Sequence, residues 1–184
     1  MIKIDEIEIR KILKEDCDFL YELAIDRLCR KNSFNSDFIS YETHIEWFHK
    51  SLENEEREIY IVQYEKKPIG QIRIDKVNEE CVEISYSIKP EYRGCGIGTA
   101  IISLIKGIII EEFKSIKIIQ GKVKFDNIQS RKVFLKNGYL EFKEGTFYKY
   151  ILNLWKVSKL EKLILDLYNN ILKRNDFKWN SKKY

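Results

Sequence analysis

Apolar and polar positions alternate along this chain with two different periods, which separate the predicted strands from the predicted helices. Alternation with a period of two predicts strands at residues 6–12, 59–64, 69–75, 81–88, 117–123, 139–142 and 146–152. Apolar residues spaced three and four apart predict helices that start after Asp16, Ser40, Gly98 and either Asp126 or Asn127. The order of elements is therefore β-α-α-β-β-β-α-β-α-β-β, which belongs to the mixed α/β (α+β) class.

The connections between these elements indicate how the strands pair. The strands at 59–64, 69–75 and 81–88 are joined by short polar turns, which is typical of an antiparallel meander. The segment 27–40 is polar and is predicted to be irregular, and Gly138 is predicted to end the last helix of the core. We therefore expect a mostly antiparallel central sheet flanked by helices.

A glycine-rich turn joins the strand at 81–88 to the longest apolar helix. It contains Arg93-Gly94-Cys95-Gly96-Ile97-Gly98, in which three glycines fall within five residues. Glycines let the backbone approach a ligand closely, and the first turn of a helix offers free N–H groups and the positive end of its dipole. The turn therefore suits a phosphate or pyrophosphate. It is neither a P-loop nor a good Rossmann fingerprint, and a tight turn without a ligand is the structural alternative.

This stretch resembles the acetyl-CoA pyrophosphate loop of the GNAT family of N-acetyltransferases, Arg/Gln-x-x-Gly-x-Gly/Ala, with the usual Pro-Glu-Tyr before it at 90–92. The order of elements from Glu6 to about Leu154 is also similar to that family's. The resemblance implies the GNAT fold and an enzyme that uses acetyl-CoA as cosubstrate. It implies contacts to acetyl-CoA from Ile88, Lys89, Arg93, Gly94, Cys95, Gly96, Ile97, Gly98 and Thr99.

The length of 184 residues suits one domain, and the resemblance implies that residues 1–154 form the acetyltransferase domain, followed by a C-terminal helical extension, residues 155–184. The extension carries an apolar stripe from Leu160 to Leu172, predicting a helix that packs either on its own domain or on a second copy in a homodimer. Hydrophobic residues make up 44% of the chain and charged residues 34%, as in ordinary globular proteins.

Charge and cysteine usage exclude several other classes. The net charge of +4 is too small for a typical nucleic-acid binder, and no apolar run is long enough to span a membrane. The four cysteines show no metal-site or disulfide spacing, and the N-terminus lacks a signal-peptide core. We therefore expect a cytoplasmic protein without a metal, a nucleic-acid partner or a membrane partner.

Acetyl transfer to an amine requires a base, a donor for the thioester oxygen and a proton for the leaving sulfur. Glu83 is the acid within the strand at 81–88 and shares one face with Ser85 and Ser87. The resemblance implies that Glu83 is the general base and that a backbone N–H near Ser87 or Ile88 polarises the carbonyl. The alternative for Glu83 is a solvent-facing strand residue.

A second family signature lies at the following helix, where the resemblance implies contacts to the CoA arm from Asn127, Ser130 and Phe134. Many family members place a tyrosine seven residues after this asparagine, where it protonates the leaving thiolate. This chain has Phe134 there, so the usual general acid is missing. Tyr86, Tyr139, Tyr148 or solvent are the candidates to replace it.

The family reads its acceptor with the first two helices and the segment between them. Here these carry Asn32, Phe34, His44 and Trp47, and Arg73 is a further candidate contact for an anionic acceptor. The pattern resembles acetyltransferases of nucleotide-linked amino-sugar pathways, such as those that make pseudaminic acid. His44 and Trp47 share one helix face, as acceptor contacts or alternatively as core residues.

Three functions follow from these observations. The first is acetyl-CoA-dependent N-acetylation of a small amine, with a nucleotide-linked amino sugar as the candidate acceptor. The second is acetylation of a protein N-terminus, as in ribosomal-protein acetyltransferases. The third is a CoA-binding module without catalysis, which the absence of the usual tyrosine favours.

Overall fold

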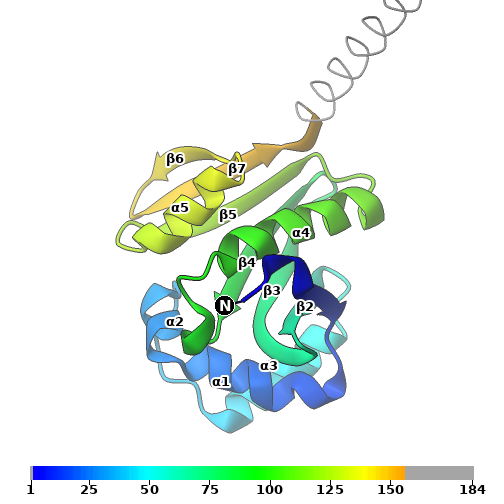
Figure 1. The fold of residues 1–184 in the computed structure, drawn as a ribbon, viewed down its shortest axis with the longest axis vertical. Coiled ribbons are helices and arrows are strands. Elements are labelled where there is room, and N and C mark those ends of the chain that lie inside the picture. Colours follow the sequence, from blue (N-terminus) through cyan, green and yellow to red (C-terminus); the bar gives the residue numbers. More distant parts are fainter. Residues whose placement is uncertain (1, 156–184) are drawn as a thin grey trace, which may run out of the picture. The chain divides into compact units, whose positions relative to one another are not determined.

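The computed structural model describes residues 2–155 and, within that range, contains one seven-stranded sheet with the order β1-β2-β3-β4-β5-β7-β6 (Figure 1). The strands are β1 (Ile7–Lys11), β2 (Arg57–Tyr64), β3 (Lys67–Asn78), β4 (Cys81–Ile88), β5 (Ile118–Lys124), β6 (Leu140–Glu144) and β7 (Phe147–Asn153). The α-helices are α1 (Cys17–Ile25), α2 (Arg27–Asn32), α3 (Tyr41–Leu52), α4 (Ile97–Glu112) and α5 (Ile128–Lys136).

Strand pairing confirms the predicted meander and the mostly antiparallel sheet. The pairs β1–β2, β2–β3, β3–β4 and β6–β7 are antiparallel, and β4 pairs with β5 in parallel. The β2–β3 turn has positive φ at Glu65 and Lys66, the left-handed geometry that suits a tight hairpin. The parallel pair requires a crossover connection, and α4 provides it.

The two faces of the sheet are covered by different helices. On one face, Ile59 and Ile61 of β2 pack in a cluster with apolar residues of α1 and α3, including Leu20 and Phe48. On the other face lies α4, whose residues Ile101, Ile102, Ile105 and Ile109 are completely buried. Its C-terminal end reaches β2, because the Tyr60 hydroxyl of β2 donates to Glu112 Oε2 at 3.3 Å.

Two local predictions were wrong for a physical reason. The segment 27–40 is not irregular throughout, because Asp26 accepts a hydrogen bond from the Cys29 amide at 2.9 Å and caps the short helix α2. Asp16 does not cap α1 with its side chain. It is buried instead, and its carboxylate accepts from Arg10 and from the Leu13 amide, each at 2.7 Å.

Three other helix ends were predicted correctly, whereas α4 begins at Ile97, two residues before the start predicted after Gly98. Ser40 accepts from the Thr43 amide at 3.2 Å, and Asn127 accepts from the Ser130 amide at 3.2 Å. Gly138 follows α5 with φ +80. In the described part of the chain, no helix is both long and apolar enough to cross a membrane.

The chain divides into a compact unit up to Leu152 and a second unit from Asn153 on. The structure describes residues 153–155 of the second unit. The predicted C-terminal helix and its homodimer contact therefore lie outside the described residues, and the domain boundary at 154/155 stays a prediction.

Candidate active site

The glycine loop leads into the N-terminus of helix α4, which no side chain caps. Gly94 and Gly96 have φ of +78 and +84, and Gly96 is the N-cap residue of α4 without any side-chain cap. Their left-handed conformation is one that residues with a Cβ adopt only at a cost. A Cβ on Gly94 would meet nothing within 4 Å, and one on Gly96 only Ile4 Cδ1 at 3.9 Å. The space beside these two glycines is thus open, and the N–H groups of the first turn of α4 are candidates to bind an anion there.

The other residues of this loop contribute in different ways. Cys95 is exposed, Ile97 is buried in the core, and Thr99 is partly buried with its amide bonded to Gly96 O at 3.0 Å. Gly98 is buried, and its missing side chain leaves room for a neighbour, because a Cβ there would lie 3.3 Å from Tyr86 Cε2. The backbone N–H groups of this loop, not its side chains, are therefore the candidates to bind an anion.

Arg93 fixes the loop from inside. Its Nε donates to Ile88 O at 2.8 Å, and its Nη2 forms an ion pair with Asp26, the cap of α2. Burial tends to raise the pKa of Asp26, but the hydrogen bonds from Arg93 and the Cys29 amide outweigh it and lower the pKa. Arg93 thus holds α2 against the loop, and this role leaves little of its guanidinium for a ligand.

Strands β4 and β5 separate just before this loop. In the described part of the chain, their parallel ladder joins Cys81, Val82 and Glu83 to residues 118–120. Both strands continue beyond that point, β4 to Ile88 and β5 to Lys124. The edge of β4 that faced β5 is therefore without a ladder partner over residues 84–88, and such backbone groups bind a ligand readily.

The register decides which backbone groups of β4 face this separation. Lys89 N–H donates to Ile69 O at 2.8 Å, toward β3. Alternate residues of an antiparallel ladder turn both of their polar groups to the same neighbour, so Ser87 also faces β3, whereas Tyr86 and Ile88 face away. This corrects the prediction for Ser87, whose N–H does not point into the separation.

The predicted main-chain contacts of Lys89 also need correction, since both of its backbone groups have partners within the chain. Its N–H is bonded to Ile69, and its carbonyl accepts from the Tyr92 amide at 3.0 Å. The carbonyl of Ile88 is taken by Arg93. The N–H groups of Tyr86 and Ile88 are the donors that the register leaves for a carbonyl oxygen.

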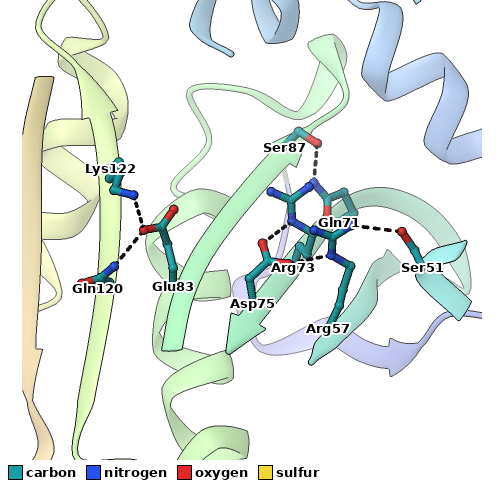
Figure 2. A network of polar contacts seen from close by, with 9 residues as sticks. All are labelled: Ser51, Arg57, Gln71, Arg73, Asp75, Glu83, Ser87, Gln120 and Lys122. Atoms are coloured by element: carbon teal, nitrogen blue, oxygen red, sulfur yellow. Dashed lines mark hydrogen bonds and ion pairs between the residues drawn. The ribbon is translucent and has the colours of Figure 1, made fainter. Parts of the chain in front are cut away.

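Glu83 lies at the last paired position, where the two strands begin to separate (Figure 2). Its Oε2 accepts from Gln120 Nε2 at 2.8 Å and lies 2.9 Å from Lys122 Nζ. Both contacts come from β5 and hold the carboxylate in place while its side chain stays 28% exposed. The prediction that Glu83 shares a face with Ser85 and Ser87 agrees with the strand register.

The same face of the sheet continues across β3 as a polar network (Figure 2). Gln71 Nε2 donates to Ser87 Oγ at 3.2 Å. Asp75 Oδ1 accepts a hydrogen bond from Arg57 Nε at 2.6 Å, and Asp75 Oδ2 lies 2.7 Å from Arg73 Nε. The second contact is an ion pair without a hydrogen bond, because the N–H of Arg73 does not point at the oxygen. Two guanidinium groups share one carboxylate, so this cluster keeps a net positive charge.

Phe134 lies in the core rather than at an open surface. It is 2% exposed, and its ring stacks on Tyr150 with centroids 4.9 Å apart. A Cβ on Gly121 of β5 would lie only 2.4 Å from Phe134 Cζ, so the para end of the ring fills the space above that glycine. This packing favours a core role over the predicted contact with the CoA arm.

The N-terminus of α5, the helix that carries Phe134, lies where the sequence predicted it. Asn127 and Ser130 start α5, joined by the capping bond, and both are partly buried. Helices α4 and α5 are neighbours here, because the position of a Cβ on Gly98 is 3.2 Å from Val133 Cγ2. Asn127 and Ser130 therefore stay candidates for contact with a ligand that enters from the glycine loop.

His44 also lies in the core, contrary to the prediction of an acceptor contact. It is 2% exposed, and its Nε2 lies 3.0 Å from Cys17 O. Burial is the main cause that lowers its pKa. Its ring is 5.4 Å from that of Trp47, so the two do share a face, but Trp47 packs against the cluster formed by α1, α3 and β2.

The segment after α2 is closer to an open surface. Phe34 is 54% exposed, and its ring meets Phe147 of β7 edge-on with centroids 5.4 Å apart. Asn32, the last residue of α2, is partly buried. Lys124 of β5 reaches the same segment, because its Nζ donates to Lys31 O at 2.9 Å. These contacts bring the C-terminal ends of α2 and β5 and the start of β7 together.

Several of these residues escaped the sequence analysis. Gln120 and Lys122 hold Glu83, and their alternate positions within the predicted strand were a signal that they share a face. The parallel register with β4 was needed to show which face. The sequence also gave no signal for the role of Gly121. Only its contact with Phe134 explains why a glycine is present in this strand.

Comparison with known proteins places the chain in a family. The model of the Acetyltransferase (GNAT) family matches residues 9–139, so the chain belongs to the GNAT family of acetyltransferases. The acetyl donor of this family is acetyl-CoA. A search of curated proteins gave no match.

Solved structures show the same fold at low identity. Spermidine N-acetyltransferase from Vibrio cholerae, in complex with CoA and spermine, aligns with TM-score 0.73 and 17% identity over 81% of this chain and 96% of that one. The N-acetyltransferase PseH from Campylobacter jejuni, in complex with acetyl coenzyme A, aligns with 0.63 and 16% over 80% and 98%. A domain from Methanocaldococcus jannaschii aligns with 0.71 and 22% over 80% and 97%.

Proposed function

We propose that this acetyltransferase transfers the acetyl group of acetyl-CoA directly to the primary amine of a small acceptor that carries negative charge, such as a nucleotide-linked amino sugar. The observation that carries the proposal is the separation of β4 from β5 between Glu83 and the glycine loop. Along this separation lie the start of α4, which can bind an anion, the N–H groups of Tyr86 and Ile88, and the carboxylate of Glu83.

Each of these groups supplies one requirement of the reaction. The first amides of α4 bind the pyrophosphate, and Asn127 and Ser130 border the arm that follows. The N–H of Tyr86 or Ile88 donates to the thioester oxygen, where negative charge develops. Glu83 accepts a proton from the attacking amine, directly or through one water, because an alkyl ammonium titrates near 10 and must lose its proton to react.

The charge of the β3–β4 face supports an anionic acceptor. Arg57 and Arg73 share the single carboxylate of Asp75. A polyamine carries several positive charges and would be repelled by this cluster, whereas the phosphates of a nucleotide would be attracted. The exposed ring of Phe34 beside Phe147 offers an aromatic surface on which a base can stack.

A thiol-release assay with acetyl-CoA and a panel of amines tests the proposal. We expect turnover with nucleotide-linked amino sugars and little or none with spermidine or peptides. Turnover of spermidine alone would contradict the anionic acceptor, and turnover of peptides alone would favour acetylation of protein N-termini. Acetyl-CoA binding without release for any amine would instead favour the binding module.

The variant Arg73→Gln sharpens this test. Loss of one positive charge at the cluster should raise KM for an anionic acceptor several-fold and leave KM for acetyl-CoA unchanged. The variant Arg73→Lys keeps the charge and serves as its control, so it should retain most of the affinity. Equal KM values in both variants and the parent would remove Arg73 from acceptor binding.

A further inference from the structure

Helix α2 is connected to both of the strands that separate beyond Glu83. We propose that α2 bridges the separation of β4 and β5, bound by Asp26 at one end and by Lys124 at the other, and keeps the strands at the spacing that the pantetheine arm of acetyl-CoA needs. Asp26 and Lys124 are then positioning residues, because they act through α2 and not on the reacting atoms. The inference rests on the proposed function, which places the arm of acetyl-CoA in this separation.

The separation begins where the ladder between β4 and β5 ends. Ladder hydrogen bonds hold paired strands about 4.8 Å apart, and in the described part of the chain those of β4 and β5 stop at Glu83 and Gln120. Beyond that point other contacts must fix the distance between the strands. On one face α4 and α5 join the two sides, since Asn137 of α5 donates from Nδ2 to Thr99 O of α4 at 3.3 Å. On the face of Glu83, helix α2 is placed to do the same.

The N-terminal end of α2 is bound to the end of β4. Asp26 is the N-cap of α2, and its Oδ1 forms an ion pair with Arg93 Nη2. The Nε of the same guanidinium donates to the carbonyl of Ile88, the last residue of β4, at 2.8 Å. The side chains of Asp26 and Arg93 are only 17% and 25% exposed, so water screens their attraction little. One arginine therefore connects the helix to the strand.

The C-terminal end of α2 is bound to the end of β5. Lys124 is the last residue of β5, and its Nζ donates to the carbonyl of Lys31 at 2.9 Å. The last carbonyls of a helix have no partner within the helix, and a lysine is well suited to bind them. Lys31 Nζ also lies 3.7 Å from Asp126, but both side chains are more than half exposed, so this ion pair contributes little. The hydrogen bond of Lys124 is the main contact at this end.

The position and length of α2 fit a bridge on the face of Glu83. Alternation along β5 puts Lys124 on the same face as Gln120 and Lys122, which hold Glu83, so α2 crosses the separation on that face. Six residues give α2 a length of roughly 9 Å, nearly twice the spacing of paired strands, which is about 4.8 Å. Strands held that far apart leave room for one extended chain between them, and the arm of acetyl-CoA is such a chain.

The alternative is that the two contacts stabilise α2 independently. Free-energy effects of contacts that share no partner and lie at opposite ends of a helix are usually additive. A bridge behaves differently, because it fixes the spacing of the strands only while both of its ends are bound. Loss of either end removes the whole effect, so the loss of the second end adds nothing.

Calorimetric titration with acetyl-CoA tests the proposal on the parent, Asp26→Ser, Lys124→Met and the double variant. Serine still caps α2 but is too short to meet Arg93, and methionine nearly keeps the length of lysine without its donor. We expect each single variant to bind acetyl-CoA several-fold more weakly, and the double variant to bind no more weakly than the single ones. The nucleotide 3′-phospho-ADP keeps the pyrophosphate of CoA but lacks the pantetheine arm, so it should bind to all four proteins equally.

Two control variants complete the test. Lys124→Arg keeps a donor at the end of β5 and should bind acetyl-CoA as the parent does, and so should Glu8→Gln, which loses a surface ion pair with Lys66. Losses that add in the double variant, losses that 3′-phospho-ADP shares, or unchanged affinities in the single variants would each overturn the proposal. If the parent binds acetyl-CoA but acetylates no amine, the proposed function fails, and the titrations still decide whether α2 bridges the separation.

Discussion

The two faces of the sheet at β4 and β5 differ in how they are filled. On the face of α4 and α5, packing leaves almost no space, so that Gly98 and Gly121 have no side chain because Tyr86 and Phe134 take the room. On the opposite face, Glu83 forms an ion pair with Lys122, and Asp75 forms one with Arg57. These charged groups stay partly exposed. The difference teaches that the first face fixes the geometry of the strands, while the second offers groups that can meet an acceptor.

Phe134→Ala should produce the largest effect and should act on stability. Loss of a buried phenylalanine leaves a cavity above Gly121 and costs about 3–5 kcal/mol of unfolding free energy. Chemical denaturation measures it, and the exposed Phe142→Ala should cost far less. The acetyl-CoA affinity of the folded variant should be unchanged. A loss of affinity without a loss of stability would restore the cofactor contact predicted from the sequence.

Gly96→Asp should act on cofactor affinity instead. A carboxylate next to the first amides of α4 repels a pyrophosphate by about 4 kcal/mol per pair of charges at 4 Å and an effective dielectric constant of 20. Acetyl-CoA affinity should thus fall by roughly 10³-fold. Gly96→Asn is the matched control, because it places a similar side chain at φ +84 without the charge. Equal affinities in the two variants would mean that the pyrophosphate binds elsewhere.

Glu83→Gln should lower the rate by about 10²-fold, the typical scale for a general base, and should leave stability and cofactor affinity nearly unchanged. The amide can still meet Gln120, so the site keeps its shape while losing the base. Glu80→Gln is the control, since Glu80 pairs with Lys117 at the surface. A parent-like pH–rate profile in Glu83→Gln would exclude Glu83 from catalysis.

The sequence predicted the packed face and the glycine loop well because their signals are local. Alternation placed Glu83 on the face of Ser85 and Ser87, and the glycines located the helix start to within two residues, since it was predicted after Gly98 and α4 begins at Ile97. Capping chemistry likewise identified Ser40 and Asn127 correctly. In each of these cases the deciding contact is made within a few residues along the chain.

The remaining errors arose where distant segments decide the outcome. His44 fits a helix face that points either to an acceptor or to the core, and only its contact with Cys17 shows that it points to the core. The N–H of Ser87 depends on the pairing with β3, which the sequence of β4 does not contain. Phe134 lies on its predicted helix, but its contact with Gly121 could not be predicted because Gly121 lies on another element.

The smallest expected effect is on the stability of the fold at acidic pH and involves Asp16, which lies well before β4 in the sequence. Burial favours the protonated form, but the hydrogen bonds from Arg10 and the Leu13 amide outweigh it and lower the pKa of the Asp16 carboxyl. The unfolded chain therefore binds a proton at Asp16 more readily than the folded protein does. Stability from this group is present above the unfolded pKa, near 4, and is lost as the pH falls through the folded value.

Asp16→Asn removes this titration. The slope of unfolding free energy against pH below about 4 should become shallower in the variant, by at most one proton or about 1.4 kcal/mol per pH unit. Urea titrations at a series of pH values measure the slope, and Asp5→Asn serves as an exposed control. An identical slope in parent and Asp16→Asn would mean that Arg10 does not hold the carboxyl charged in the folded state. Activity at neutral pH should follow only the fraction folded, because Asp16 contacts neither the glycine loop nor the separated edge of β4.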